Sequence, residues 1–366
     1  MRTPTRTPPP PVRISRAART AARERRRRMA AAILALVLAG AAWLLFVDGG
    51  SDPPGSAART GGASRTEGAA DVPAALFAIS LRGAGVPLMA IVRTGGAEVP
   101  VLTIPADLTL EIPGLGQGTT ATIADQDAEG MRVSLANVAG TWIDHYLRLD
   151  MDAIATLADA AGGLEVTLPG TANLTGRTVG PGAVTLSGTE LHEYLDIPGP
   201  NAFTRWEIVL PSILQAPTGL TGVSDDLQKV SRLLPVGGEV RIGTFPTHIS
   251  SSSARVPDYP ALDALMARDF GLERAPVAVL VQNGMGDPGI GGPVAARLVP
   301  EGFRVIFSSN ADDFDHRTTE VIAGGDEYVR DAQRARRALG VGVVGLTHVP
   351  SGVADITIVI GKDFTA

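Results

Sequence analysis

Residues 141–169, TWIDHYLRLDMDAIATLADAAGGLEVTLP, decide the fold class of this chain. Apolar side chains at three- and four-residue spacing predict a helix: Ile154, Leu157, Ala158 and Ala161. Asp150 or Asp152 can cap the start of this helix, and the glycine pair 162–163 can end it. Residues 164–168 then alternate apolar and polar as in a strand. The order strand, helix, glycine stop, strand indicates a βαβ-type unit in an α/β domain.

Strand and helix patterns continue on both sides of this stretch. Before it lie strand-like runs at 76–81, 87–92 and 98–104, and after it a closing strand at 239–245. Serines at 250–253 and prolines at 257 and 260 mark a boundary, beyond which strands and helices alternate again. We therefore expect an α/β/α domain over 71–250, a linker over 251–274 and a small α/β domain over 275–366.

The N-terminal residues carry a membrane-anchor pattern. Residues 1–28 hold ten arginines against Glu24 alone and predict a disordered basic tail. Met29–Val47 is 19 residues without a charge, which at about 1.5 Å per residue matches the hydrocarbon thickness of a bilayer. The arginines place its start in the cytoplasm. We prefer a retained transmembrane helix to a cleaved signal peptide because no small-residue cleavage site follows the run. Residues 48–70 predict a flexible linker.

Composition and scattered motifs exclude several function classes. The chain has no cysteine, which excludes disulfides and cysteine metal sites. The arginine run could indicate nucleic-acid binding, but the apolar run that follows it decides against that reading, so we expect no nucleic-acid partner. The Gly284-x-Gly286-x-x-Gly289 pattern matches a dinucleotide fingerprint. We reject that reading because Pro288 removes a backbone donor and about 90 residues are too few for a full dinucleotide fold. The five histidines are scattered, so we expect no metal site.

Several motifs resemble the LytR-CpsA-Psr domain of bacterial cell-envelope proteins. They are I-D-H-Y at 143–146, L-x-D-x-x-G-G-x-x-V at 157–166, T-I-P-A-D at 103–107 with I-P-G at 112–114, and L-S-G-T-E-L-H-E-Y-L at 186–195. Residues 277–363 resemble the LytR C-terminal domain that often follows it. The resemblance implies a membrane-anchored transferase that moves a glycopolymer from a polyprenyl-pyrophosphate carrier onto the cell wall. Arginines would hold the diphosphate and aspartates a magnesium ion.

The charged positions of that family are nearly all replaced in this chain. Ala106, Gly85 and Ile208 stand where the resemblance implies arginines, Ala202 where it implies an aspartate and Val209 where it implies a glutamine. Only Asp107 and Arg205 remain, and a single arginine cannot hold a diphosphate. We therefore assign no catalytic residue, cofactor or metal.

Our interpretation is a membrane-anchored, extracytoplasmic, non-catalytic binding or scaffolding protein in cell-wall or glycopolymer assembly. Its partners would be the cytoplasmic membrane and either a polyprenyl-linked glycopolymer or envelope-assembly proteins. The alternative is an active phosphotransferase of the LytR-CpsA-Psr type with a rebuilt site and Mg²⁺. A transcriptional regulator is disfavoured because the expected membrane span exports the folded part.

The charge asymmetry generates a topology prediction. A reporter enzyme that is active only in the cytoplasm should be silent when fused after Ala366 and active when fused before Met1, because the arginines keep the N-terminus inside. Activity of the C-terminal fusion in intact cells would exclude this topology.

Overall fold

The computed structural model describes residues 75–82, 87–199, 201–216, 239–347 and 353–366. The expected basic tail, transmembrane helix and linker, residues 1–70, lie outside the described residues. Within the described ranges, no helix combines the length and apolar character needed to cross a membrane.

A mixed five-stranded sheet forms the centre of the first domain, in the order β11-β3-β2-β1-β6. Its strands are β1 (Leu76–Arg82), β2 (Leu88–Arg93), β3 (Glu98–Ile104), β6 (His145–Asp150) and β11 (Glu239–Thr244). β2 runs antiparallel to β1 and β3, whereas β6 is parallel to β1 and β11 is parallel to β3. Apolar side chains alternate between the two faces, so both faces of the sheet are buried.

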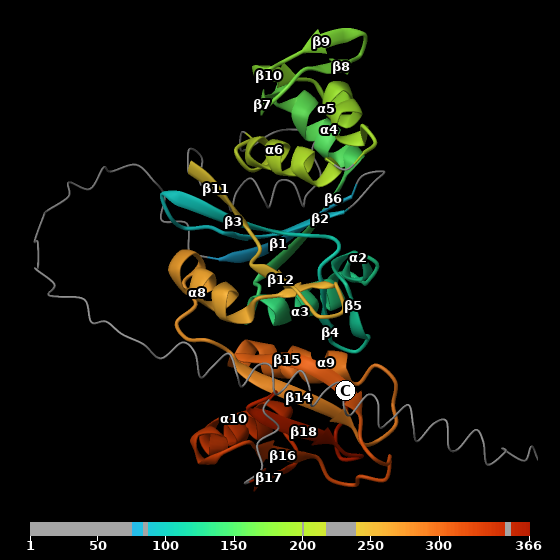
Figure 1. Ribbon diagram of the computed structural model, residues 1–366, viewed down its shortest axis with the longest axis vertical. Helices are drawn as coiled ribbons and strands as arrows, with labels where there is room; N and C mark the ends of the chain where they lie inside the picture. Colours follow the sequence, from blue (N-terminus) through green and yellow to red (C-terminus); the bar gives the residue numbers. More distant parts are fainter. Residues whose placement is uncertain (1–74, 83–86, 200, 217–238, 348–352) are drawn as a thin grey trace, which may run out of the picture. The chain divides into compact units, whose positions relative to one another are not determined.

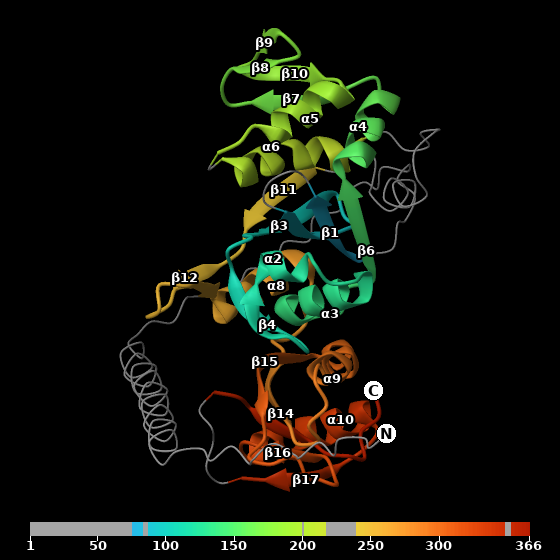
Figure 2. The ribbon, with the colours of Figure 1, turned by 90° about the vertical axis from the view of Figure 1, so that its right-hand side faces the viewer.

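Helices cover both faces of this sheet (Figures 1 and 2). On one face, Phe77 and Ile79 share a core with α4 (Met151–Ala160), α5 (Gly188–Asp196) and α6 (Ala202–Leu214). On the other face, Met89 and Ile91 share a core with α3 (Ala128–Ala139) and α8 (Tyr259–Phe270). The expected mixed α/β fold is confirmed. Short elements complete the domain: β4 (Thr109–Ile112), β5 (Gly116–Thr119), α2 (Thr120–Ile123), β8 (Ala172–Leu174), β9 (Arg177–Val179), β12 (Thr247–Ile249) and β13 (Arg255–Pro257).

The stretch 141–169 folds as β6, α4 and β7 (Leu164–Leu168), in the predicted order. Asp150 caps α4 by accepting the backbone N–H of Ala153 at 2.8 Å. However, β7 does not join the sheet of β6. It pairs antiparallel with β10 (Gly182–Leu186) in a separate two-stranded sheet. The βαβ interpretation was therefore wrong. The strict in–out alternation of β7 is the reason, because the buried parallel strand of a βαβ unit is apolar on both faces.

The C-terminal part is a second five-stranded sheet, in the order β15-β14-β18-β16-β17. Its elements are β14 (Val277–Asn283), α9 (Gly291–Leu298), η1 (Val299–Glu301), β15 (Phe303–Asn310), β16 (Glu320–Ala323), η2 (Asp326–Tyr328), α10 (Val329–Leu339), β17 (Val343–Leu346) and β18 (Ile356–Ile360). β14 is parallel to both of its neighbours, β15 and β18.

Residues 251–274, where we expected a linker, contain β13 and the twelve-residue helix α8. Leu262, Met266 and Phe270, four residues apart, form the buried stripe of α8. Asp258 caps the helix by accepting the N–H of Ala261 at 3.2 Å. The serines and prolines around this segment obscure the helical spacing in the sequence.

One buried amide side chain joins α3 to the edge strand β15. Asn137, which is 0% exposed, donates to the carbonyl of Val305 at 2.8 Å and accepts the N–H of Val305 at 2.7 Å. Next to it, Arg304 donates to the carbonyl of Asn137 at 3.3 Å and pairs with Asp263 of α8 at 2.7 Å. Side chains from both sheets form one continuous core around this junction.

Asn137→Ala should lower the free energy of unfolding by about 2–4 kcal/mol, because it leaves the buried N–H and C=O of Val305 without partners. Asn173→Ala is the matched control, since Asn173 is exposed on β8 and should change stability by less than about 0.5 kcal/mol. Equal denaturant midpoints for the wild-type chain and Asn137→Ala would contradict this role.

Candidate functional site

The carboxyl ends of β3 and β11 form the first candidate site, because these two parallel strands end side by side. The fully buried Thr103, near the end of β3, donates its hydroxyl to Glu207 Oε1 of α6 at 2.6 Å. Glu207 is only partly buried. This carboxylate does not belong to any motif that we recognised in the sequence. Glu207 lies over the strand ends because α6 packs against this face of the sheet.

Asp107, one of the two remaining family positions, lies three residues beyond β3. Its side chain is 69% exposed, and it accepts a hydrogen bond from Arg255 Nε of β13 at 3.2 Å. Arg255 is 148 positions away in the sequence, and no motif indicated it. Asp107 is therefore already paired with a cation from within the protein.

Arg205, the other remaining position, is 8% exposed and lies in the first turns of α6. Its guanidinium donates to the backbone carbonyl of Ile197, where α5 ends. Its Nε has no hydrogen-bond partner among the described residues. Since residues two positions apart on a helix point in nearly opposite directions, Arg205 faces the α5–α6 junction while Glu207 faces the sheet.

The structure therefore does not bring Asp107 and Arg205 together. Within the described ranges, they share no hydrogen bond and no ion pair. Asp107 is held by β13, and Arg205 is held by the end of α5.

The replaced family positions on α6 serve packing. Val209 is fully buried, and Ile208 packs against the same core. Before α2, Ala106 offers its backbone carbonyl to the N–H of Ala121 at 3.2 Å. Gly85 lies outside the described residues. A glutamine side chain at the Val209 position would be desolvated without a partner, so the apolar core accounts for this replacement.

The donor set near Asp107 does not fit a magnesium ion. A hard cation of this kind prefers several oxygen ligands, whereas the carboxylate of Asp107 is engaged by Arg255. Across the part of the chain that the structure describes, no group of three or more histidine or acidic side chains could hold one metal ion.

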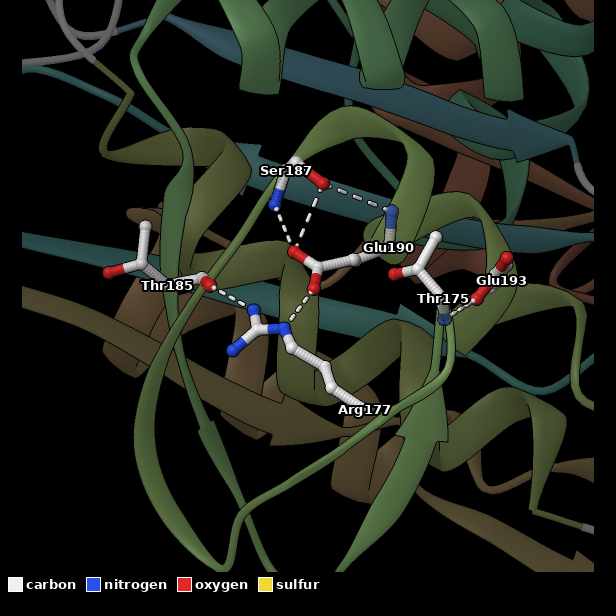
Figure 3. Close-up of polar contacts among 6 residues, drawn as sticks. All are labelled: Thr175, Arg177, Thr185, Ser187, Glu190 and Glu193. Carbon is white, nitrogen blue, oxygen red and sulfur yellow. Dashed lines mark hydrogen bonds and ion pairs between the residues drawn. The ribbon is translucent and has the colours of Figure 1, made fainter.

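The motif at 186–195 has a structural explanation (Figure 3). Ser187 and Glu190 form a capping box at the start of α5: the Ser187 hydroxyl accepts the N–H of Glu190 at 3.4 Å, and the Ser187 N–H donates to Glu190 Oε2 at 3.0 Å. Arg177 of β9 donates to the other oxygen of the same carboxylate. This arginine, helped by the Ser187 N–H, lowers the pKa of Glu190 to about 2.

A cleft of about 600 Å³ lies beside α5, lined in part by Asp159, His192, Glu193 and Asp196. Two of these carboxylates have structural partners. Asp159 accepts the N–H of Gly188 at 2.7 Å, and Glu193 accepts the N–H of Thr175. These contacts hold the start of α5 and the β8–β9 turn. Asp159 and Glu193 therefore have structural roles that explain their presence in the cleft without a ligand.

The glycine-rich loop 284–289 meets the I-P-G segment of the first domain. A Cβ added at Gly114 would lie 2.9 Å from the carbonyl oxygen of Gly289, and one added at Gly291 would lie 2.8 Å from the nitrogen of Gly114. Real side chains do not tolerate such distances. Gly114 also has a φ of +85°, which favours glycine. The glycines therefore allow two backbone segments to approach closely.

Glu190→Gln should destabilise the protein at neutral pH, and the difference should disappear as the pH falls toward 2. A carboxyl whose pKa is lowered by folding contributes stability above its unfolded value of about 4.5 and loses it on acidification. Urea midpoints between pH 2 and 7 measure this, with the exposed Glu165→Gln as control. A difference between wild type and Glu190→Gln that does not change with pH would contradict the ion-pair account.

Comparisons with known proteins find a family match in each of the two domains. The LytR_cpsA_psr family matches residues 88–197, and the LytR_C family, described as LytR cell envelope-related transcriptional attenuator, matches residues 276–364. No curated protein matches the chain. Similar solved structures include a transcriptional regulator from Enterococcus faecalis, with 18% identity, 54% of this chain and 88% of that one covered, and a TM-score of 0.45.

Two further structures have 16% identity and a TM-score of 0.43. The first is TagU of Bacillus subtilis, and the match covers 56% of this chain and 99% of TagU. The second is the LytR-CPS2A-psr family protein YwtF (TagT) with bound octaprenyl pyrophosphate lipid, and the match covers 54% of this chain and 91% of that one. The family matches agree with the motifs at 103–114, 143–166, 186–195 and 277–363. Residues 88–197 are therefore similar to the LytR_cpsA_psr family, and residues 276–364 are similar to the LytR_C family.

Proposed function

We propose that this protein is a non-catalytic LytR_cpsA_psr-type protein that binds or scaffolds components of cell-wall or glycopolymer assembly. In this proposal, residues 29–47 anchor it in the cytoplasmic membrane, and the domains at 71–250 and 275–366 lie outside. One observation carries it: the two remaining family positions, Asp107 and Arg205, are engaged in separate contacts within the protein.

The charge balance supports the absence of phosphotransfer. A diphosphate carries at least two negative charges, and holding it away from water requires several cationic donors. Arg205 is buried against the end of α5, and Arg255 is paired with Asp107. Ile208 and Val209 add only apolar surface. This set of side chains offers no converging clamp for a pyrophosphate.

The proposed ligand is a polyprenyl-linked glycopolymer. The family match over residues 88–197 supports a role in the cell envelope. Among the similar structures, one TagT structure contains an octaprenyl pyrophosphate lipid and another is bound to LI-WTA. For this chain we infer that affinity comes from buried apolar area of the lipid tail and not from the diphosphate, since apolar burial needs no cations.

The alternative, an active phosphotransferase with a rebuilt site and Mg²⁺, draws on a different observation. Two charged side chains outside the family pattern, Glu207 and Arg255, lie at the end of β3. A rebuilt site would have to use them in place of the missing arginines and aspartate.

A polyprenyl diphosphate assay separates the two functions. The purified full chain in detergent should bind a short polyprenyl diphosphate without hydrolysing or transferring it, and EDTA should not change the binding. Asp107→Asn should leave binding unaltered, as should the control Asp312→Asn in an exposed loop. Magnesium-dependent turnover that Asp107→Asn abolishes and Asp312→Asn preserves would establish the alternative.

A further inference from the structure

We propose that the C-terminal domain and the β4–β5 turn of the first domain together form a binding site for a neutral hydroxyl-bearing ligand such as one sugar residue of a glycan. The site is a cleft of about 290 Å³ lined in part by Gly114, Gly116, Asn283, Ile290, Ser308 and Asn310. This volume is at the lower end of the range for small-molecule sites. The inference does not depend on the proposed function of the first domain.

The cleft lies where α/β folds usually bind ligands. Asn283 and Asn310 are the last residues of the parallel strands β14 and β15. The chain leaves β14 through α9 to reach β15 on one side, whereas β18 pairs with β14 on the other side. Ligands of open α/β sheets commonly bind outside the carboxyl ends of the strands, and the cleft lies at the carboxyl ends of β14 and β15.

A bulge in β15 sets which side chain faces this cleft. Val279 pairs with Val305, but the next residue, Leu280, pairs with Phe307, so Ile306 is an extra residue in β15. The extra residue shifts the pairing by one position and brings Ser308 opposite Val281. Bulges commonly re-aim a side chain beside a functional site.

Ser308 presents a polar atom that the protein itself satisfies only weakly. Ser308 lines the cleft, and its buried Oγ makes no hydrogen bond of good geometry among the described residues, although Ser308 interacts with the carboxyl group of Glu111 and lowers its pKa. Glu111 of β4 lies beside it and is 5% exposed, and its Oε1 is equally without a well-directed partner. Buried polar groups are normally hydrogen-bonded. A hydroxyl group of a ligand in the cleft would supply the missing bond to Ser308.

The charges around the cleft favour a neutral ligand. No arginine or lysine is among its described lining residues. Burial raises the pKa of Glu111, which favours its neutral form and disfavours a carboxylate beside the cleft. α9 begins at Gly291 without a side-chain cap. The N–H of Gly292 already donates to Gly289 and Pro293 has no N–H, which leaves the N–H of Gly291 to donate to a ligand oxygen. Donors and acceptors without a net charge match a sugar ring better than a phosphate.

The probe is N-acetylglucosamine, which carries ring hydroxyls and an amide carbonyl, titrated against the full chain in detergent with ligand-detected NMR. We expect saturable binding that Ser308→Ala weakens by about three- to tenfold, as one lost hydrogen bond would. The denaturant midpoint should change little, because the Ser308 hydroxyl makes only a poorly directed contact with Glu111.

Ser80→Ala is the matched control. Ser80 is a second buried serine whose hydroxyl has no partner among the described residues, but it belongs to β1 and does not line the cleft. It should leave sugar binding unchanged. Asn310→Trp should block the cleft and abolish binding.

Three results would overturn the proposal: no saturable binding of N-acetylglucosamine, equal binding by wild type and Ser308→Ala, or an equal loss in Ser80→Ala. Tighter binding of inorganic phosphate at the same residues would also overturn it, since that result would identify an anion site. Polyprenyl diphosphate binding by Ser308→Ala should equal that of wild type, so failure here is distinguishable from failure of the proposed function.

Discussion

The pairing of the Asn137 side chain with the backbone of Val305 is the interaction on which the arrangement of the two domains depends. An amide side chain presents an N–H donor beside a C=O acceptor at the spacing of a peptide group, so Asn137 pairs with the edge of β15 as a one-residue strand would. Unpaired edge strands are prone to unwanted pairing. This contact closes part of that edge with a helix, and Arg304 strengthens it by joining Asn137 to Asp263. The core around these residues then extends through both sheets.

The need to fill this core distinguishes the structural features that the chain has from the charged family positions that it lacks. The sheet, the cap at Asp150 and the capping box at Ser187–Glu190 depend on apolar alternation and local hydrogen bonds, and all are present. The positions where the family has charged side chains are not under that constraint. Ile208 and Val209 extend the core, and Asp107 is paired with an arginine from β13. A fold can be kept while individual charged positions change, because packing and chemistry draw on different residues.

Local signals in the sequence predicted the strand and helix of 145–160, the cap and the strand at 164–168, because their periodicity and capping residues are contiguous. The family motifs predicted both domains. Long-range pairings were not predictable from those signals. The pairing of β7 with β10 depends on the tertiary packing of the helices around them. The Asp107–Arg255 contact joins residues that are 148 positions apart in the sequence. Asn137 lies inside an apolar helical stretch, and only the approach of β15 gives it a partner.

The Asn137 contact also bears on how fragments of this chain behave. A C-terminal piece beginning at residue 275 would retain β15 but lose α3 and α8, and with them the groups that cover Val305 and neutralise Arg304. The exposed backbone of that strand would be available to the same strand of another molecule, so such a piece would be prone to self-association at the concentrations used for crystallisation or NMR. A fragment that is to remain monomeric should therefore begin before β1, because α3 and α8 pack on the sheet that β1, β2 and β3 form.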